Sequence, residues 1–345
     1  MHYRYIPILK WKRGERRAIK AVTPEIATGV CPLITLTEET FKDQPETATS
    51  ESIPASLLFA DEIYKHWGSR PFFLNASMIQ ASAGGIHPLI DTAERCRRLG
   101  AKLTPATPLT PSAAYEAAVS NVTQTDNRGV ALSVTLAEFT RAAQWLPSWP
   151  HALNQTDLIL DLADKVAMIA DLGSVLEMAF RSLPRGIEWR SVTVAGTSMP
   201  ANFITFDKDA IHLIDRKEWT LWQHLISLSL PYRLDYGDYA TTAAIMLPPP
   251  DLSWGFPINV RYTLPTEFLV CRGVRTRGEG ARDLEKQLIA HATVIERYGR
   301  RSRLSCWADE TIDKIAAMEQ KPEGLEHWVR IAVNRHITRV RTDMP

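Results

Sequence analysis

Eight short segments rich in β-branched and apolar residues recur along the chain, and segments with helical periodicity separate them. This alternation constrains the fold most strongly, because parallel strands need long crossover connections that are usually helices. The clearest helix repeats its apolar residues at the i, i+3, i+4 spacing between Leu172 and Leu183. The eight strand-like segments are residues 5–9, 31–36, 71–75, 102–106, 129–134, 157–162, 191–196 and 232–236.

Eight strand and helix units in a chain of this length predict an α/β fold of the (β/α)8 TIM-barrel type. An open, doubly wound sheet would show the same alternation and is the main rival. No G-x-G-x-x-G or G-x-x-x-x-G-K-[ST] motif follows any of the eight segments, so the phosphate-binding signatures that often accompany such a sheet are missing. The count of strands therefore favours the barrel.

The eighth unit is irregular. After it comes an insertion at about 243–275 that contains LPPPDLSWG and then NVRYTL and EFLVCRG, separated by Pro265-Thr266. The second part predicts a β-hairpin with a two-residue turn. Because the insertion follows the eighth strand, we expect it over the carboxyl-terminal mouth, where barrel sites are built. We predict a barrel over 1–300 and extra carboxyl-terminal helices over 301–345 that pack on it.

Composition narrows the class of protein. With 45% hydrophobic residues, the 345 residues can bury a large core, and a formal charge of +1 gives no indication of nucleic acid. The four cysteines form no C-x-x-C pair, and no run of apolar residues approaches the length of a membrane span. We therefore predict a soluble cytoplasmic protein with free thiols and no membrane partner.

Polar residues at the ends of the strands should converge on one mouth if the barrel forms. Lys10 and Lys12 lie two residues apart and so point to the same side of an extended chain. We expect them to find counter-charges in the aspartates of the sixth and eighth strands. The candidate mouth residues from the strands and the hairpin are Lys10, Lys12, Asn75, Asp161, Asp164, Asp235, Asp238, Arg261 and Arg272.

Two interpretations of these charges stay open. One is a structural network of ion pairs that closes the top of the barrel. The other is an anion-binding or catalytic pocket, in which a lysine acts as a base or forms a Schiff base, or paired carboxylates hold a divalent cation. Arg261 and Arg272 suit bidentate anion recognition as well as ordinary salt bridges. The nine histidines show no H-E-x-x-H motif, so no metal site is predicted.

Four motifs together resemble the Beta family, which includes the Beta protein of satellite phages and relatives in bacterial genomes and mobile elements. They are YIPILKWKRGERRAI at the start, LILDLAD, YGDYA, and a W-x-x-x-x-x-N-x-H pattern formed by Trp328, Asn334 and His336. The resemblance spans the whole chain. It implies a setting among phage–host conflict genes, including restraint of a toxic neighbour, and no settled activity or cofactor. It gives weight to the matched residues Lys10, Trp11, Lys12, Glu15, Asp161, Asp238 and Tyr239 as a shared mouth.

The sequence thus supports two main hypotheses. The first is a binding protein for phage defence, antiviral defence or toxin restraint, which takes a protein partner, or a small ligand or anion, at the barrel mouth. The second is a barrel enzyme, a hydrolase or one with phosphate-ester chemistry, that uses the same lysines and carboxylates. A purely structural role remains a third hypothesis, since a fold does not define a function.

Overall fold

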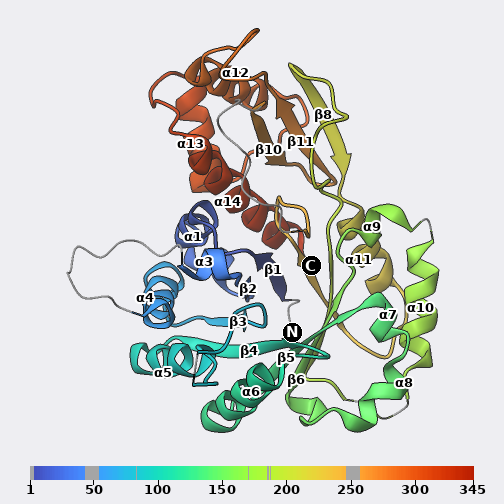
Figure 1. Cartoon of the computed structure of the whole chain (residues 1–345). Coiled ribbons are helices and arrows are strands. Elements are labelled where there is room, and N and C mark those ends of the chain that lie inside the picture. The colour runs from blue at the N-terminus through green and yellow to red at the C-terminus, as the bar shows by residue number, and fades with distance from the viewer. Residues whose placement is uncertain are drawn as a thin grey trace.

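The computed structural model describes residues 4–42, 54–82, 84–169, 171–184, 186, 188–245 and 257–345. Eight parallel strands form a closed barrel in the order β1-β2-β3-β4-β5-β6-β7-β9 (Figure 1), which confirms the predicted fold. Tyr5 of the first strand pairs with Tyr236 of the last and closes the ring. The barrel strands are Tyr5–Leu9 (β1), Leu33–Thr35 (β2), Pro71–Asn75 (β3), Lys102–Pro108 (β4), Val130–Thr135 (β5), Thr156–Asp161 (β6), Ser191–Gly196 (β7) and Leu234–Asp238 (β9).

Alternation along each strand divides the barrel into an inner and an outer core. In β1, Ile6 and Ile8 point into the barrel, whereas Tyr5 and Leu9 pack against the surrounding helices. Small residues offset bulky ones inside the ring, as in other barrels of this size. The buried inner cluster consists of Ile6, Ile8, Cys31, Leu33, Phe73, Ala106, Ala131, Ile159, Ala195 and Tyr239.

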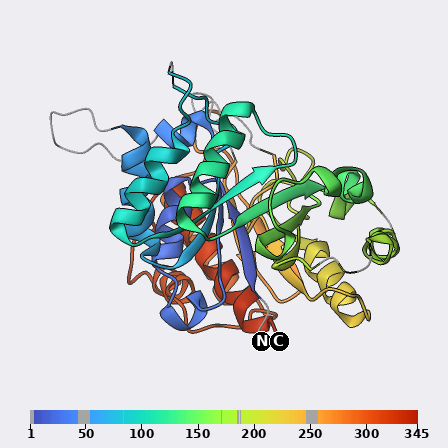
Figure 2. The same ribbon diagram turned by 90° about the horizontal axis from the view of Figure 1, so that it is seen from below.

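Helices surround the barrel, as the view from below shows (Figure 2). Gly100 ends α5 with a left-handed φ of 81°, which glycine adopts without strain. The helices of this layer are Arg13–Lys20 (α1), Pro24–Ala27 (α2), Glu38–Lys42 (α3), Ala55–Trp67 (α4), Leu89–Leu99 (α5), Ala113–Asp126 (α6), Leu136–Phe139 (α7), Ala142–Trp145 (α8), Lys165–Met168 (α9), Leu172–Ser182 (α10) and Lys217–Ser227 (α11), with 3-10 turns at Leu146–Ser148 and Leu153–Gln155.

A second, smaller sheet lies above the barrel in Figure 1. The predicted hairpin is present as Asn259–Thr263 (β10) and Glu267–Arg272 (β11). A third strand, Ala210–Asp215 (β8), pairs antiparallel with β11 and was not predicted from the sequence. It enters from the connection between β7 and α11. The LPPPDLSWG part of the expected insertion lies outside the described residues.

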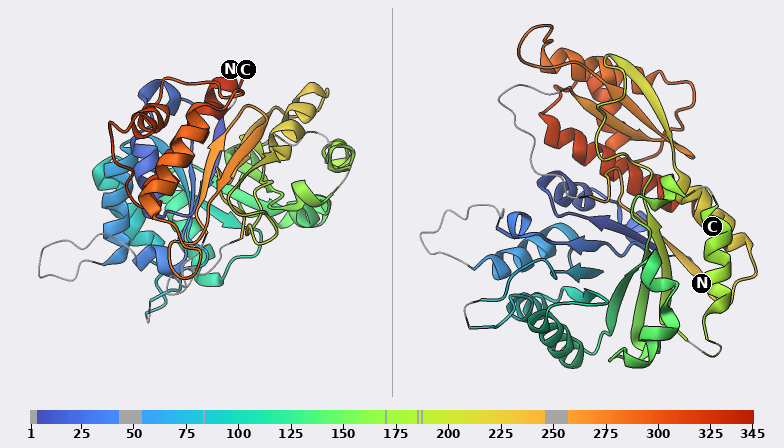
Figure 3. Two further views of the ribbon diagram at one scale, coloured as in Figure 1. Left: turned by 90° about the horizontal axis from the view of Figure 1, so that it is seen from above. Right: turned by 45° about the vertical axis from the view of Figure 1, so that its right-hand side comes forward.

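The last three helices complete the molecule. Leu284–Glu296 (α12) and Trp307–Ala316 (α13) pack against each other, and α12 also contacts β10. Leu325–Asp343 (α14) packs against α1, α2 and β1 on one side and against β10 and α13 on the other (Figure 3). Within this carboxyl-terminal part of the chain, α14 is the helix that lies against the barrel beside its first strand. Among the described residues, no helix has both the length and the apolar character needed to cross a bilayer.

Candidate functional site

The chain bends in the same unusual way just beyond three barrel strands. Trp11, Ala163 and Ala240 follow β1, β6 and β9, and each has a left-handed φ, at 60°, 49° and 52°. In two of these bends an aspartate stabilises the turn: Asp161 Oδ1 accepts from the Ala163 amide at 2.9 Å, and Asp238 Oδ1 accepts from the Ala240 amide at 2.9 Å. Such backbone costs about 1–3 kcal/mol per residue and is concentrated at functional sites. This strain lies at the carboxyl-terminal mouth.

Lys10 lies inside this mouth. It continues the inward face of Ile6 and Ile8, and its Nζ donates to the carbonyl oxygens of Ala243 at 2.6 Å and Ile245 at 2.7 Å. Burial lowers the pKa of Lys10 to about 8. No carboxylate of the described residues forms a salt bridge with it, so the prediction that the lysines pair with the aspartates of the sixth and eighth strands is wrong.

Lys12 does not share this position. The left-handed turn at Trp11 redirects the chain, so that Lys12 begins α1 with an exposed side chain. Its backbone amide donates to Glu15 Oε2 at 2.9 Å. Glu15 is 1% exposed, and burial raises the pKa of its carboxyl group. The expectation that both lysines point to one side is wrong, because β1 ends at Leu9 and the chain is no longer extended between Lys10 and Lys12.

Asp161 at the end of β6 and Tyr239 just after β9 meet in the mouth, on strands separated by β7. The Tyr239 hydroxyl donates to Asp161 Oδ2, and burial raises the pKa of Asp161. Asp164 follows at the start of α9 and is half-buried. Asn75 ends β3, where its Oδ1 accepts from the Ser77 amide at 3.0 Å in another local turn. The described residues contain no group of three or more His, Cys, Asp or Glu side chains placed to hold a metal ion.

The hairpin presents one face to its helices and the other to the barrel. Val260 and Tyr262 belong to the core formed with α12, α13 and α14. Arg261 must therefore point to the opposite face, because successive strand residues alternate. Arg272 pairs directly with Asn259, two residues from Arg261, so both arginines lie on the face away from that core.

Both arginines keep donors without partners. Arg261 Nη1 donates to the Thr241 carbonyl at 2.8 Å, and its guanidinium lies 5.3 Å from the Phe203 ring. Its Nε is buried without a hydrogen bond, and burial lowers its pKa to about 10. Arg272 is 5% exposed, and its Nε and Nη1 also have no partner in the described part of the chain. Buried cationic donors of this kind favour an incoming anion.

Asp238 lies between the barrel and α14 instead of inside the mouth. Its Oδ1 accepts from the Tyr5 hydroxyl at 2.6 Å, and its Oδ2 lies 2.7 Å from His336 Nε2. The other ring nitrogen of His336 lies 3.0 Å from Thr263 Oγ1. Burial lowers the pKa of His336, so we assign a neutral ring that donates to Asp238 and accepts from Thr263. Asp238 and His336 therefore hold α14, β1, β9 and β10 together.

Asp235 lies at the opposite end of the barrel. The last barrel strand begins at Leu234, two residues later than expected, which moves Asp235 from the end of the strand to its start. There it accepts from the Arg4 backbone amide and from Arg4 Nε, each at 2.9 Å. Its inclusion among the mouth residues was wrong, because the predicted strand was shifted.

Sequence reasoning missed the charges that gather at this amino-terminal end. Arg4 and Arg190 both pair with Asp157, which is 1% exposed. Burial alone would raise the pKa of Asp157, but the two guanidinium groups outweigh burial and lower it. Asp157 opens the segment DLILDL, so a charge at the first position of a buried strand was the available signal.

Comparison with known proteins agrees with the motifs. A family model described as Beta protein matches residues 5–342, nearly the whole chain. No curated protein gives a significant match. The structure brings three of the resembling motifs into contact, since Tyr5, Asp238 and His336 come from the first, third and fourth of them.

Proposed function

Because this chain belongs to the Beta protein family, we propose that it is a binding protein of phage defence or toxin restraint. In this proposal it recognises an anionic group of a protein partner, or of a small ligand, at the carboxyl-terminal mouth. The defence setting rests on the family resemblance. The place and chemistry of binding rest on the charges of the mouth.

One observation carries the binding site. Lys10, Arg261 and Arg272 form no ion pair with any described residue, although Lys10 and Arg272 are buried and Arg261 is half-buried. A buried cation without a counter-charge is costly, and an anion bound between such groups offsets that cost. The strained turns after β1, β6 and β9 support the same location, since strain persists where the surrounding structure is built around a site.

A second candidate function is catalysis at the same mouth. It is favoured by Lys10, whose pKa is lowered to about 8, because an amine that titrates near neutrality can act as a base or a nucleophile. Hydrolysis or phosphate-ester chemistry would use this amine together with Asp161. An enzymatic activity that rises with pH as the Lys10 amine loses its proton would favour this enzyme hypothesis over simple binding.

The proposal is tested by an infection assay. Bacteria that express the wild-type chain should plate a panel of phages less efficiently, or should survive co-expression of a toxic neighbouring gene. Arg261→Gln should weaken this effect, because a loss of about 1.4 kcal/mol in anion binding lowers the affinity about tenfold. The control is Arg303→Gln, which removes an exposed arginine that pairs with Asp313 at the surface.

Both variants must melt near the wild-type temperature for the comparison to count. Protection that is equal in wild type and Arg261→Gln would exclude the mouth as the binding site. If the wild-type chain neither lowers plating nor relieves toxicity, the defence role is wrong, whatever the mouth binds.

A further inference from the structure

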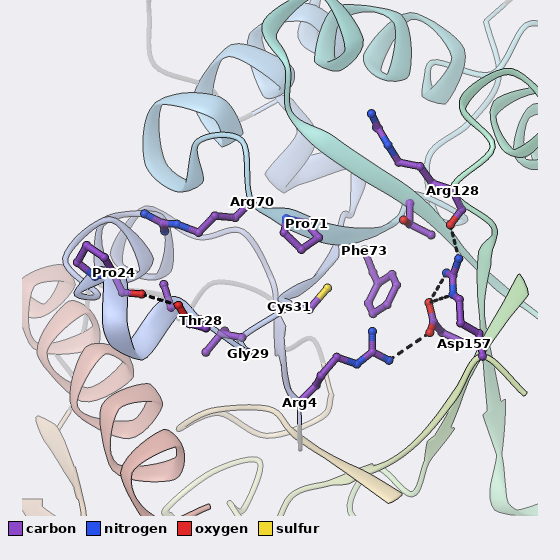
Figure 4. A pocket seen from close by; sticks show the side chains of 14 residues that line it. Arg4, Pro24, Thr28, Gly29, Cys31, Arg70, Pro71, Phe73, Arg128 and Asp157 are labelled. Atoms are coloured by element: carbon purple, nitrogen blue, oxygen red, sulfur yellow. Dashed lines mark hydrogen bonds and ion pairs between the residues drawn. The ribbon is translucent and has the colours of Figure 1, made fainter. Parts of the chain in front are cut away.

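A cavity opens at the amino-terminal end of the barrel, at the opposite end from the mouth (Figure 4). It has a volume of about 650 Å³ and lies between the starts of β1, β3 and β6 and the short helix α2. Cavities of this size accommodate small molecules. The amino-terminal end of a barrel more often serves stability, so the question is whether these charges exceed what stability needs.

Arginines dominate the polar part of the lining. Arg4, Arg70, Arg128 and Arg190 line the cavity, against the single aspartate Asp157. Figure 4 shows Arg70 and Arg128 on opposite sides of the opening, with Arg4 and Asp157 below them. Even when Asp235 behind Arg4 is counted, four guanidinium groups face two carboxylates. The cavity therefore has an excess of positive charge.

Two aspartates fix the position of the Arg4 guanidinium group. Its Nε donates to Asp235 and its Nη2 to Asp157, at 2.9 and 3.1 Å, and Arg190 binds the other side of Asp157. Burial would lower the pKa of Arg4, but Asp157 and Asp235 outweigh burial and raise it, so the group stays charged. Arg4 Nη1 has no hydrogen-bond partner among the described residues, and in Figure 4 the guanidinium points toward Phe73.

Arg70 adds a cation that the fold does not use for pairing. Its guanidinium lies 4.7 Å from the Trp67 ring, and within the described chain it forms no salt bridge. Arg128 comes no closer than 3.9 Å to Asp126, a carboxylate that Arg97 already binds. Arg70 and Arg128 therefore carry positive charge that Asp157 and Asp235 do not neutralise.

The rest of the lining is apolar and chemically inert. Pro24, Val30, Pro71 and Phe73 provide flat hydrophobic surface. Burial raises the pKa of Cys31 to about 12, so this thiol stays protonated and is no nucleophile at neutral pH. The cavity is therefore suited to hold a molecule and not to react with it.

We propose that this amino-terminal cavity binds an organic phosphate about the size of a mononucleotide. The excess of positive charge in the lining suits the dianion of a phosphate monoester, and the fork of a single guanidinium group binds two phosphate oxygens at once. The apolar wall around Phe73 receives the organic part of the ligand. The site is separate from the carboxyl-terminal mouth, so it does not depend on the function proposed above.

The test is calorimetric titration of the full chain with AMP, ribose 5-phosphate and adenosine. We expect one-to-one binding of at least one of the two phosphates, no binding of adenosine, and weaker affinity at high salt. Arg70→Ala should weaken binding about tenfold or more, since it removes a charged hydrogen-bonding group from the ligand. Arg181→Ala, which removes an arginine from an exposed pair on α10, should bind as the wild type does.

Arg4→Gln is the second variant, and Arg190 and Arg233 still pair with the aspartates that it releases. Three results would overturn the proposal: neither phosphate binds at millimolar concentration, adenosine binds as tightly as AMP, or Arg70→Ala and Arg4→Gln bind normally. If Arg261→Gln abolishes AMP binding while Arg70→Ala leaves it intact, the phosphate belongs to the mouth and the amino-terminal site is wrong.

Discussion

Glu218 is a carboxyl group in the interior whose partners satisfy only one of its oxygens. Oε2 accepts from the Ser198 amide at 2.9 Å and from the Ser198 hydroxyl, while Oε1 is buried without a hydrogen bond. Burial raises the pKa of Glu218 to about 7, and the nearby Arg216 only partly offsets this. A single side chain thus makes the folded state sensitive to pH near neutrality.

The sign of that sensitivity follows from linkage. The folded state holds the Glu218 proton more tightly than the unfolded state, whose ordinary value is 4.5, so the free energy of unfolding falls as pH rises from about 4.5 to 7. The loss from this group approaches about 3 kcal/mol, at about 1.4 kcal/mol per pH unit. Glu218→Gln should remove it, so that its urea-unfolding free energies decline less between pH 5 and pH 8 than those of the wild type.

The control for this experiment is Glu177→Gln, which changes a half-buried glutamate of α10 that pairs with Arg181. Its pH profile should run parallel to that of the wild type. A Glu218→Gln profile that also runs parallel would show that Glu218 is ionised throughout and that its pKa is not raised.

At the scale of elements, α1 and α14 approach each other at a glycine. A Cβ on Gly14 would lie 2.8 Å from Val329 Cγ1 and 2.9 Å from the Glu326 carbonyl oxygen. Gly14 is part of the KWKRGERR stretch that carries the family resemblance. The glycine in this motif is therefore explained by helix packing and not by the chemistry of the mouth.

Gly14→Ala separates two opposing effects. Helix propensity alone favours alanine by about 1 kcal/mol, but the new methyl group collides with backbone and with Val329. We expect a net loss of about 1–3 kcal/mol in the free energy of unfolding, measured by urea denaturation. Gly173→Ala in α10 is the matched control, because its Cβ would meet no backbone, only the side chains of the exposed His224 at 3.0 Å and of Leu221 at 4.0 Å.

Gly173→Ala should be neutral or stabilising. If Gly14→Ala were stabilising as well, the close packing of α1 on α14 would be wrong.

The sequence predicted some elements better than others for physical reasons. The buried strands of the barrel are continuous apolar runs, which are visible without tertiary context. β8 was missed because it is an edge strand whose apolar Ile211 and Leu213 are 48% and 43% exposed, so its pattern does not mark a buried face. Asp235 was misplaced by two residues of strand register, which carried it to the other end of the barrel.

At the scale of the whole molecule, α14 joins two separate hydrophobic cores. Val333, Ile337 and Val340 pack into the barrel core, and Trp328 and Ile331 into the core of the small sheet. The contact between His336 and Asp238 joins residues 98 positions apart. No local sequence pattern predicts a contact over this separation. The sequence therefore identified the motif that contains His336 but not the role of this residue.

A chain shortened to residue 324 should therefore fail to fold as a whole. It lacks the helix that covers β1 beside the barrel, and Asp238 loses its hydrogen bond from His336. Circular dichroism and thermal melting should show loss of the cooperative transition. Separate addition of a 325–345 peptide should restore part of the signal, whereas a peptide carrying His336→Ala should restore less. A truncated chain that melts cooperatively at the wild-type temperature would contradict this role of α14.

The packing of α14 against β1 has a consequence for biosynthesis. A ribosome adds about 5–20 residues per second, so β1 emerges tens of seconds before the helix that covers it. During that interval Tyr5, Leu9 and the starts of α1 and α2 stay without their final neighbour. Until α14 leaves the exit tunnel, this side of the nascent barrel stays uncovered and accessible to chaperones.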